Sequence, residues 1–209
     1  MTPINNKQSL RALIRKRRRA LSGPARRKAA KALLERLREL EGFMGAETVG
    51  MYLASDGEID LGPTMAWCWE NRITTCVPVM GEDDRVLSFA AMDRDTPLAA
   101  NRFGILEPRT GDGEGMDAGA LDILLMPLVA FDVRGNRLGM GGGFYDTTLR
   151  ANREAGRPQP VLAGVAHEIQ RIERIDADPW DMPLDVAVTD VAIHRFANTA
   201  IAAGASSSA

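Results

Sequence analysis

The sequence has few of the residues that build transition-metal and thiol sites. Its 209 residues include two histidines, His167 and His194, and two cysteines, Cys68 and Cys76. The cysteines are eight residues apart with no histidine nearby, a spacing that fits neither a zinc site nor a redox pair. We therefore expect both thiols to be buried apolar groups, and any bound metal to be a hard cation held by carboxylate and phosphate oxygens.

Long apolar runs are also missing. No uninterrupted apolar stretch reaches the roughly 18 residues that a membrane-spanning helix needs, and no apolar segment of a secretory signal follows the basic N-terminus. Hydrophobic residues make up 45% of the chain and charged residues 26%, as in ordinary globular proteins. We therefore expect a cytoplasmic protein that does not bind membranes. We also expect a monomer, although nothing in the sequence determines the oligomeric state.

The hydrophobic pattern predicts a single α/β domain over residues 1–196, followed by a disordered tail over residues 197–209. Two amphipathic helices open the chain, over residues 7–20 and 24–40. Ser22 is the expected N-cap of the second helix, and Gly42 is its expected stop.

Strand and helix signals then alternate, which is typical of a mostly parallel central sheet flanked by helices. The expected strands cover residues 48–54, 73–79, 86–92, 121–131, 161–166 and 186–189, and the expected helices cover residues 61–70 and 145–153. The strand at 121–131 is short and almost entirely apolar, which favours burial on both faces in a parallel sheet.

A run of basic residues, Arg-Lys-Arg-Arg-Arg, occupies positions 15–19. Clustered cations of this kind can bind the phosphate backbone of nucleic acids. The whole chain, however, has a net charge of −2, and no aromatic residue interleaves with the run. We therefore expect no nucleic-acid partner.

The sharpest local feature is a glycine-rich segment, Arg-Leu-Gly-Met-Gly-Gly-Gly-Phe-Tyr-Asp at residues 137–146. Glycines lose more conformational entropy on folding than other residues, so four in five positions indicate a backbone requirement. Strand, glycine-rich loop and helix in this order form phosphate sites, because unhindered amides and a helix N-terminus face one anion. Arg137 would add a charge-assisted contact and Asp146 could hold a cation. A flexible turn is the alternative, and the segment matches neither the P-loop nor the dinucleotide motif.

The segment 137–146 resembles the signature loop of the 5-formyltetrahydrofolate cyclo-ligase family, roughly Arg-Leu-Gly-x-Gly-x-Gly-aromatic-Tyr-Asp. Four other segments agree with that family in order and approximate spacing, and together they span almost the whole chain apart from the tail. They are Lys-Gln-Ser-Leu-Arg at 7–11, Leu53 with Glu58, Phe-Gly-Ile-Leu-Glu-Pro at 103–108, and Trp-Asp-Met-Pro-Leu-Asp at 180–185. The chain departs from the pattern at Phe144, where many members have a second tyrosine, so any hydrogen bond of that hydroxyl is lost.

The resemblance implies an enzyme that uses ATP and Mg²⁺ to convert 5-formyltetrahydrofolate into 5,10-methenyltetrahydrofolate, with release of ADP and phosphate. It assigns ATP binding to Lys7, Arg11, Arg137, Leu138, Gly139, Met140, Gly141, Gly142, Gly143, Phe144 and Tyr145. It assigns substrate binding to Leu53, Glu58, Met140, Gly141, Gly142, Gly143 and Phe144. It makes Asp146 and Asp181 magnesium ligands, and Glu58 and Arg137 candidates for the catalytic groups.

These assignments have alternatives. Lys7 and Arg11, one helical turn apart, would equally suit a solvated helix face, Glu58 could support the N-terminus of the following helix, and Asp181 could be an ordinary turn residue. For the whole chain, one alternative is a sugar-phosphate isomerase-like enzyme that uses the same loop without ATP. The other is a non-catalytic nucleotide- or folate-binding module.

Overall fold

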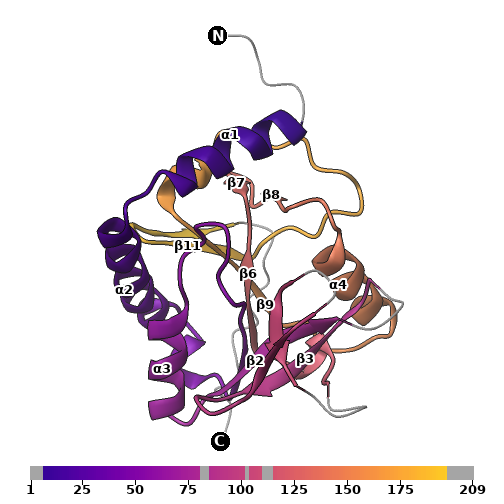
Figure 1. Ribbon diagram of the computed structural model, residues 1–209. Helices are drawn as coiled ribbons and strands as arrows, with labels where there is room; N and C mark the ends of the chain where they lie inside the picture. Colours follow the sequence, from indigo (N-terminus) through magenta and orange to yellow (C-terminus); the bar gives the residue numbers. More distant parts are fainter. Residues whose placement is uncertain (1–6, 81–84, 102–103, 110–114, 197–209) are drawn as a thin grey trace, which may run out of the picture.

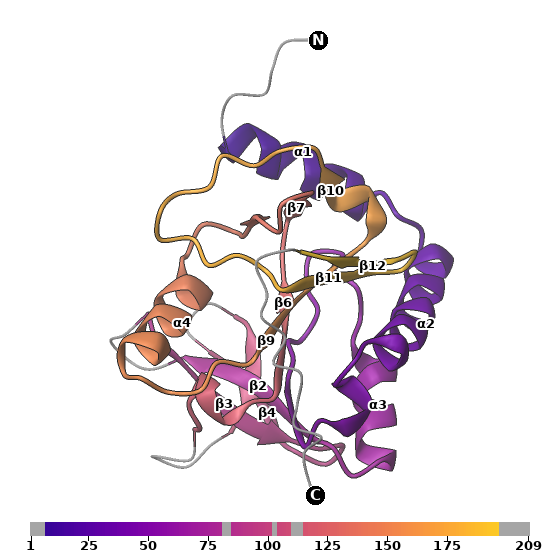
Figure 2. The ribbon, with the colours of Figure 1, turned by 180° about the vertical axis from the view of Figure 1, so that it is seen from behind.

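The computed structural model describes residues 7–80, 85–101, 104–109 and 115–196, and a seven-stranded sheet forms its centre (Figures 1 and 2). The strand order is β12-β11-β9-β6-β1-β2-β3. The strands from β11 to β2 in this order run parallel, and the edge strands β12 and β3 run antiparallel to their neighbours. The strands are β1 (Thr48–Gly50), β2 (Thr74–Met80), β3 (Leu87–Met92), β6 (Ile123–Pro127), β9 (Val161–Ala166), β11 (Val186–Thr189) and β12 (Ile193–Arg195). The predicted mostly parallel α/β fold is confirmed.

Helices cover both faces of this sheet. In both ribbon views α2 (Gly23–Glu39) and α3 (Gly62–Glu70) lie on one side and α4 (Phe144–Glu154) on the other, while α1 (Lys7–Arg19) crosses one end (Figures 1 and 2). The four helices agree with the predicted ranges to within two residues. None of the helices in the described ranges is long and apolar enough to cross a membrane.

Local signals explain the ends of α2. The Ser22 side chain accepts a hydrogen bond from the Ala25 amide at 3.3 Å, so the predicted N-cap is confirmed. Gly42, however, does not terminate α2, because the helix already ends at Glu39 with Leu40 as its C-cap. Gly42 instead adopts a left-handed conformation, with φ of 85°, and starts a short 3₁₀ turn, η1 (Phe43–Gly45).

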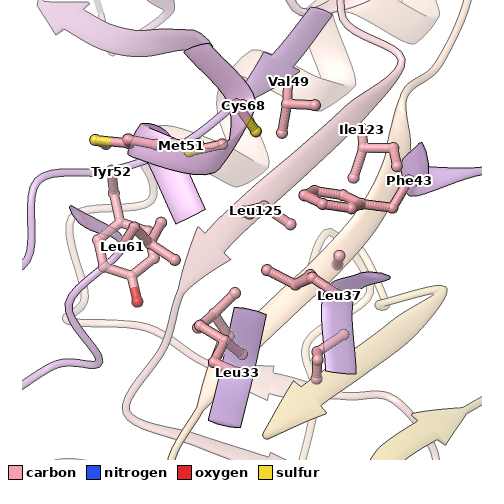
Figure 3. Packing of buried hydrophobic residues seen from close by; sticks show 14 of the residues in the cluster. Leu33, Leu37, Phe43, Val49, Met51, Tyr52, Leu61, Cys68, Ile123 and Leu125 are labelled. Carbon is pink, nitrogen blue, oxygen red and sulfur yellow. The ribbon is translucent and has the colours of Figure 1, made fainter. Parts of the chain in front are cut away.

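The larger hydrophobic core lies between α2, α3 and the sheet. Figure 3 shows Leu33 and Leu37 of α2 facing side chains of the central strands and of η1, among them Phe43 and Leu125. Burying each of these side chains completely stabilises the fold by about 1.5–3 kcal/mol. The core thereby fixes the sheet on which the functional loops are carried.

Both cysteines are buried and free, as the sequence predicts. Burial raises the pKa of Cys68 to about 12 and that of Cys76 to about 11, which makes both thiols poor nucleophiles and poor metal ligands near neutral pH.

Several strand predictions were wrong in length or number. The first strand ends at Gly50, not at residue 54. The predicted strand 121–131 is two strands, β6 and β7 (Ala130–Asp132), and β7 belongs to a separate small sheet with β8 (Arg137–Leu138) and β10 (Arg171–Ile172). Both strands are buried, so their residues form one continuous apolar run. The sequence therefore gives no sign that the chain passes from one sheet to another.

Two further differences concern the edges of the fold. The antiparallel strand β12 follows β11, which was predicted to be the last. Two short strands that the sequence did not predict, β4 (Leu98–Ala100) and β5 (Leu106–Pro108), pair in antiparallel fashion. The described residues also contain two short 3₁₀ turns, η2 (Ala118–Ala120) and η3 (Glu168–Gln170). The predicted disordered tail, residues 197–209, lies outside the described residues.

The sheet has a topological switch point between β1 and β6. From β1 the chain proceeds to β2 and β3 on one side, and from β6 to β9 and β11 on the other. Open parallel sheets bind ligands at such points, beyond the carboxyl ends of the strands. Helix α1 lies at this end, because its Ile14 packs against Val129, Leu138 and Ile175, all beyond the ends of the central strands.

Candidate functional site

The glycine loop, residues 139–143, connects β8 to α4 and is exposed along its whole length. Gly141 has a φ of 102° and Gly143 a φ of 72°, in the left-handed region that residues with a Cβ rarely adopt. The sequence predicts that Gly141 needs either a positive φ or an uncovered face toward phosphate, and the structure shows the positive φ. Because Gly143 is the N-cap of α4, the loop and the N-terminal amides of this helix lie together.

Two cations of α1 reach toward this loop and its surroundings. The Arg11 Nε donates a 2.8 Å hydrogen bond to the Gly139 carbonyl. Lys7 Nζ lies 2.6 Å from Asp178 Oδ2 and 3.4 Å from Asp181 Oδ2. Both cations therefore contact residues far away in the sequence, and their role in ATP binding stays a prediction.

The pKa of Lys7 reflects these neighbours. Partial burial would lower it, but the hydrogen bond and the negative charges from Asp178 and Asp181 outweigh burial and raise it. Lys7 is thus held in its charged form beside Asp178 and Asp181.

Arg137 fastens the base of the glycine loop. One guanidinium nitrogen donates to Asp146 Oδ1 at 2.8 Å and the other to the Met182 carbonyl at 2.6 Å, while the Met182 amide donates to the same Asp146 oxygen at 3.0 Å. The Arg137 side chain is only 5% exposed, and burial lowers its pKa despite the nearby Asp146. The arginine thus ties the start of the loop to the first turn of α4 and to the segment around Met182.

The two predicted metal ligands lie in the same corner. Asp146 is in the first turn of α4, and Asp181 immediately precedes Met182, whose amide binds Asp146. Among the residues that the structure describes, no group of three or more histidine, cysteine, aspartate or glutamate side chains is arranged to hold a metal. This donor set fits Mg²⁺, which is usually held by one or two carboxylates together with substrate phosphates and water.

The irregular segment 51–61 follows β1 at the switch point. It carries Leu53 and Glu58, the predicted substrate contacts, and is called the substrate loop below for that prediction. Leu53 is partly buried against the larger core. Glu58 folds back on the same loop, where its Oε2 accepts a 3.0 Å hydrogen bond from the Ser55 amide. Helix α3 begins only at Gly62 and has Leu61 as its N-cap, so the carboxylate of Glu58 caps its own loop and not the helix.

Burial shapes the chemistry of Glu58. Its side chain is 11% exposed, and burial raises its pKa, against the opposing effects of the Ser55 amide and the Arg18 cation. Burial also raises the pKa of Tyr145, and the negative charge of Glu58 raises it further. The start of α4 and the substrate loop therefore lie close enough for their charges to interact.

Three residues around the site were not predicted. Asp178 binds Lys7, and Arg18 and Asp56 bind each other at 2.7 Å beside Glu58. Asp178 has no pattern that separates it from other turn acids. The partners Arg18 and Asp56 are 38 residues apart, and no local signal joins them.

The comparisons with known proteins agree with this geometry. The sequence profile of the 5-formyltetrahydrofolate cyclo-ligase family matches residues 3–190. The 5-formyltetrahydrofolate cyclo-ligase of Escherichia coli K12 is 36% identical over 178 residues, which cover 85% of this chain and 96% of that protein. The enzyme of the same name from Haemophilus influenzae is 36% identical over 179 residues, covering 85% and 94%.

A solved structure shows the same fold. The NMR structure of Aquifex aeolicus 5,10-methenyltetrahydrofolate synthetase superimposes with a TM-score of 0.76 at 30% identity, over 92% of this chain and 94% of that chain. These findings confirm the resemblance that the glycine loop and the four accompanying segments indicate. The chain belongs to the 5-formyltetrahydrofolate cyclo-ligase family.

Proposed function

We propose that this protein catalyses the ATP-dependent conversion of 5-formyltetrahydrofolate into 5,10-methenyltetrahydrofolate, with release of ADP and phosphate. The observation that carries the proposal is the meeting of the glycine loop, the cations of α1 and two carboxylates at the carboxyl end of the sheet. The proposed reaction needs a polyphosphate site and a folate site side by side, and the switch point of an open parallel sheet is a place where ligands can bind.

The glycine loop and α1 form the proposed ATP side. Unhindered loop amides and the N-terminus of α4 provide donors for phosphate oxygens, and Arg11 holds the loop through the Gly139 carbonyl. We assign ATP to Lys7, Arg11 and residues 137–145. In this assignment Arg137 acts mainly by holding the loop, because its guanidinium is already bound to Asp146 and Met182.

Asp146 and Asp181 are the residues we assign to Mg²⁺. Bound there with the nucleotide, Mg²⁺ would neutralise charge on the phosphate oxygens. Lys7, which lies between Asp178 and Asp181, adds a further positive charge at the same place.

The substrate loop forms the proposed folate side, with Leu53 as an apolar contact and Glu58 as a buried carboxylate. Residues 140–144 border it from the glycine loop. The raised pKa of Glu58 makes it a stronger base than an exposed glutamate, which suits acceptance of a proton during ring closure.

The chemistry follows from the substrate. A formamide carbon is a weak electrophile, and its oxygen is a poor leaving group. Transfer of the γ-phosphoryl group from ATP to the formyl oxygen forms an O–P bond and releases ADP. N10 then attacks the formyl carbon, the C–O bond breaks, phosphate leaves with the formyl oxygen, and N10 loses its proton. In this scheme no protein side chain forms a covalent bond with the substrate. Catalysis therefore depends on positioning the two substrates and on neutralising charge at the phosphoryl group.

The test is the absorbance of the methenyl product, measured with and without ATP, together with ADP release. We expect product only with ATP, at one ADP per methenyl group. A sugar-phosphate isomerase-like enzyme would show no folate-dependent ATP hydrolysis, and a non-catalytic module would bind without turnover. The expected cytoplasmic, monomeric state stays a prediction, and gel filtration tests its second part.

A further inference from the structure

The basic run 15–19 lies outside the residues assigned to ATP, and three of its arginines bind one carboxylate. Arg15 Nε lies 2.8 Å from Asp56 Oδ2, Arg18 binds the same oxygen at 2.7 Å, and Arg19 binds Asp56 Oδ1. Neutralising one carboxylate needs one cation. Three cations from one helix therefore point to a requirement for fixed geometry at Asp56.

Arg18 extends this geometry across the switch point. Its side chain is fully buried, and its guanidinium donates to the Asp56 carbonyl at 3.0 Å and to the Leu128 carbonyl at 3.2 Å. Asp56 belongs to the substrate loop after β1, and Leu128 follows β6. The rigid fork of one guanidinium thus joins the chain segments beyond the two central strands.

The turn that Arg18 holds has two successive left-handed residues, Asp56 with a φ of 51° and Gly57 with a φ of 78°. Glycine adopts this conformation freely, but at Asp56, which has a Cβ, it costs free energy and persists where surrounding contacts hold it. His167 adds a further contact, with its Nε2 at 3.2 Å from the Gly57 carbonyl.

Glu58 immediately follows this turn. Its Oε2 is bound by Ser55, and its Oε1 lies 3.7 Å from the Arg18 guanidinium. The place of the carboxylate therefore depends on the turn at residues 56–57 and on Arg18. We infer that Asp56 and Arg18 are positioning residues that fix the substrate loop, and through it the Glu58 carboxylate, for the folate substrate. This inference rests on the proposed function, because that function gives Glu58 its substrate.

The test compares Asp56→Asn with Arg17→Gln. Asparagine has the size of aspartate and tolerates positive φ, so Asp56→Asn removes the charge while keeping the turn accessible. Arg17 is exposed on the same helix, so Arg17→Gln removes one charge without touching the turn. We expect Asp56→Asn to lower kcat/KM for 5-formyltetrahydrofolate by on the order of 10-fold to 10²-fold, with the KM for ATP within about 2-fold. Arg17→Gln should match the wild type.

Arg18→Lys is the second variant, because it keeps the buried charge but loses the fork that bridges Asp56 and Leu128. We expect it to show the same folate-specific defect, whereas wild-type kinetics would overturn the role of the guanidinium. A lower melting temperature with unchanged folate kinetics in the folded protein, in either variant, would make the cluster merely structural and overturn the inference. Equal losses for ATP and folate would overturn it as well.

A readout without ligand separates this inference from the proposed function. Hydrogen exchange of the free protein should speed up in residues 51–61 of Asp56→Asn, with the glycine loop unchanged. If the wild type does not cyclise the folate, the proposed function fails, and this exchange measurement alone decides whether Asp56 fixes the substrate loop. Unchanged exchange in residues 51–61 would overturn the inference whatever the activity.

Discussion

The glycine loop and the substrate loop face the same end of the sheet, but they are held in opposite ways. The glycine loop is exposed, built from backbone and supported by contacts at its edges, such as Arg11 on the Gly139 carbonyl. The substrate loop is largely shielded from solvent, and its Asp56 forms ion pairs with three arginines of α1. An anion such as polyphosphate can be bound by bare amides, whereas a buried carboxylate needs neighbours that fix its position.

The largest expected effect is that of a substitution at Gly141, which tests whether the backbone of the glycine loop binds phosphate or is only a flexible turn. Gly141 has a φ of 102°, so a residue with a Cβ at this position would be strained by about 1–2 kcal/mol. The added Cβ would also displace a bound phosphate. We expect Gly141→Ala to fold but to lose on the order of 10²-fold in ATP-dependent cyclisation, as measured by methenyl absorbance and ATP titration.

Two glycines supply matched controls for this variant. Gly42 has a φ of 85° and open space around it, so Gly42→Ala introduces a similar backbone strain. Because Gly42 precedes β1, at the opposite end of this strand from the substrate loop, the variant should keep full activity. Gly139 has open space around it and no positive φ, so Gly139→Ala should keep the stability of the fold. Its ATP affinity should fall, because the added methyl group lies in the loop that we assign to the phosphates. Normal ATP affinity and turnover in both loop variants would remove the loop from the phosphate site.

A smaller effect is expected from Asp181→Asn, which tests the acidic corner beside the loop. The variant removes one proposed magnesium ligand and one partner of Lys7. We expect the magnesium concentration for half-maximal rate to rise by roughly 10-fold, with the folate KM nearly unchanged. Excess chelator should abolish wild-type activity. An unchanged magnesium titration would exclude Asp181 from the metal site.

Glu58→Gln is expected to affect the other substrate. The amide keeps the shape and the acceptor for the Ser55 amide but loses the charge, so we expect weaker folate binding or turnover with ATP affinity nearly unchanged. Burial raises the pKa of Glu58, so ionising it costs stability as the pH rises through that pKa. Near neutral pH the variant should therefore be at least as stable as the wild type. A clear loss of stability with normal kinetics would assign Glu58 a structural role instead.

The last effect concerns the acid stability of the fold and reports on the arginine cluster. Burial would raise the pKa of Asp56, but its hydrogen bonds to Arg15, Arg19 and Arg18 outweigh burial and lower it to about 2. A lowered pKa means stability that is present above the unfolded value, near 3.9, and is lost as the pH falls toward 2. We expect about 2 kcal/mol of such loss in the wild type, and much less in Asp56→Asn, from denaturant unfolding across this pH range. Equal slopes in the two proteins would contradict the ion-pair assignment.

The same contrast explains how much could be predicted from the sequence. Helices with a cap and an apolar stripe, such as α2 after Ser22, were predicted nearly to the residue, because their signals are local. The glycine loop was predicted for the same reason. The split of residues 121–131 between two sheets was not, because a buried strand and a buried sheet change have the same apolar composition. The pairs Lys7 with Asp178 and Arg18 with Asp56 depend on contacts 171 and 38 residues apart, which only the fold creates.

The account requires the two loops to bring the γ-phosphate of ATP and the formyl oxygen of the folate to one point. The most direct test follows that oxygen, using 5-formyltetrahydrofolate labelled with ¹⁸O in the formyl group and mass analysis of the released phosphate. We predict one labelled oxygen per phosphate, in step with methenyl formation. Label released as water, with unlabelled phosphate, would contradict phosphorylation of the formyl oxygen and with it the central claim.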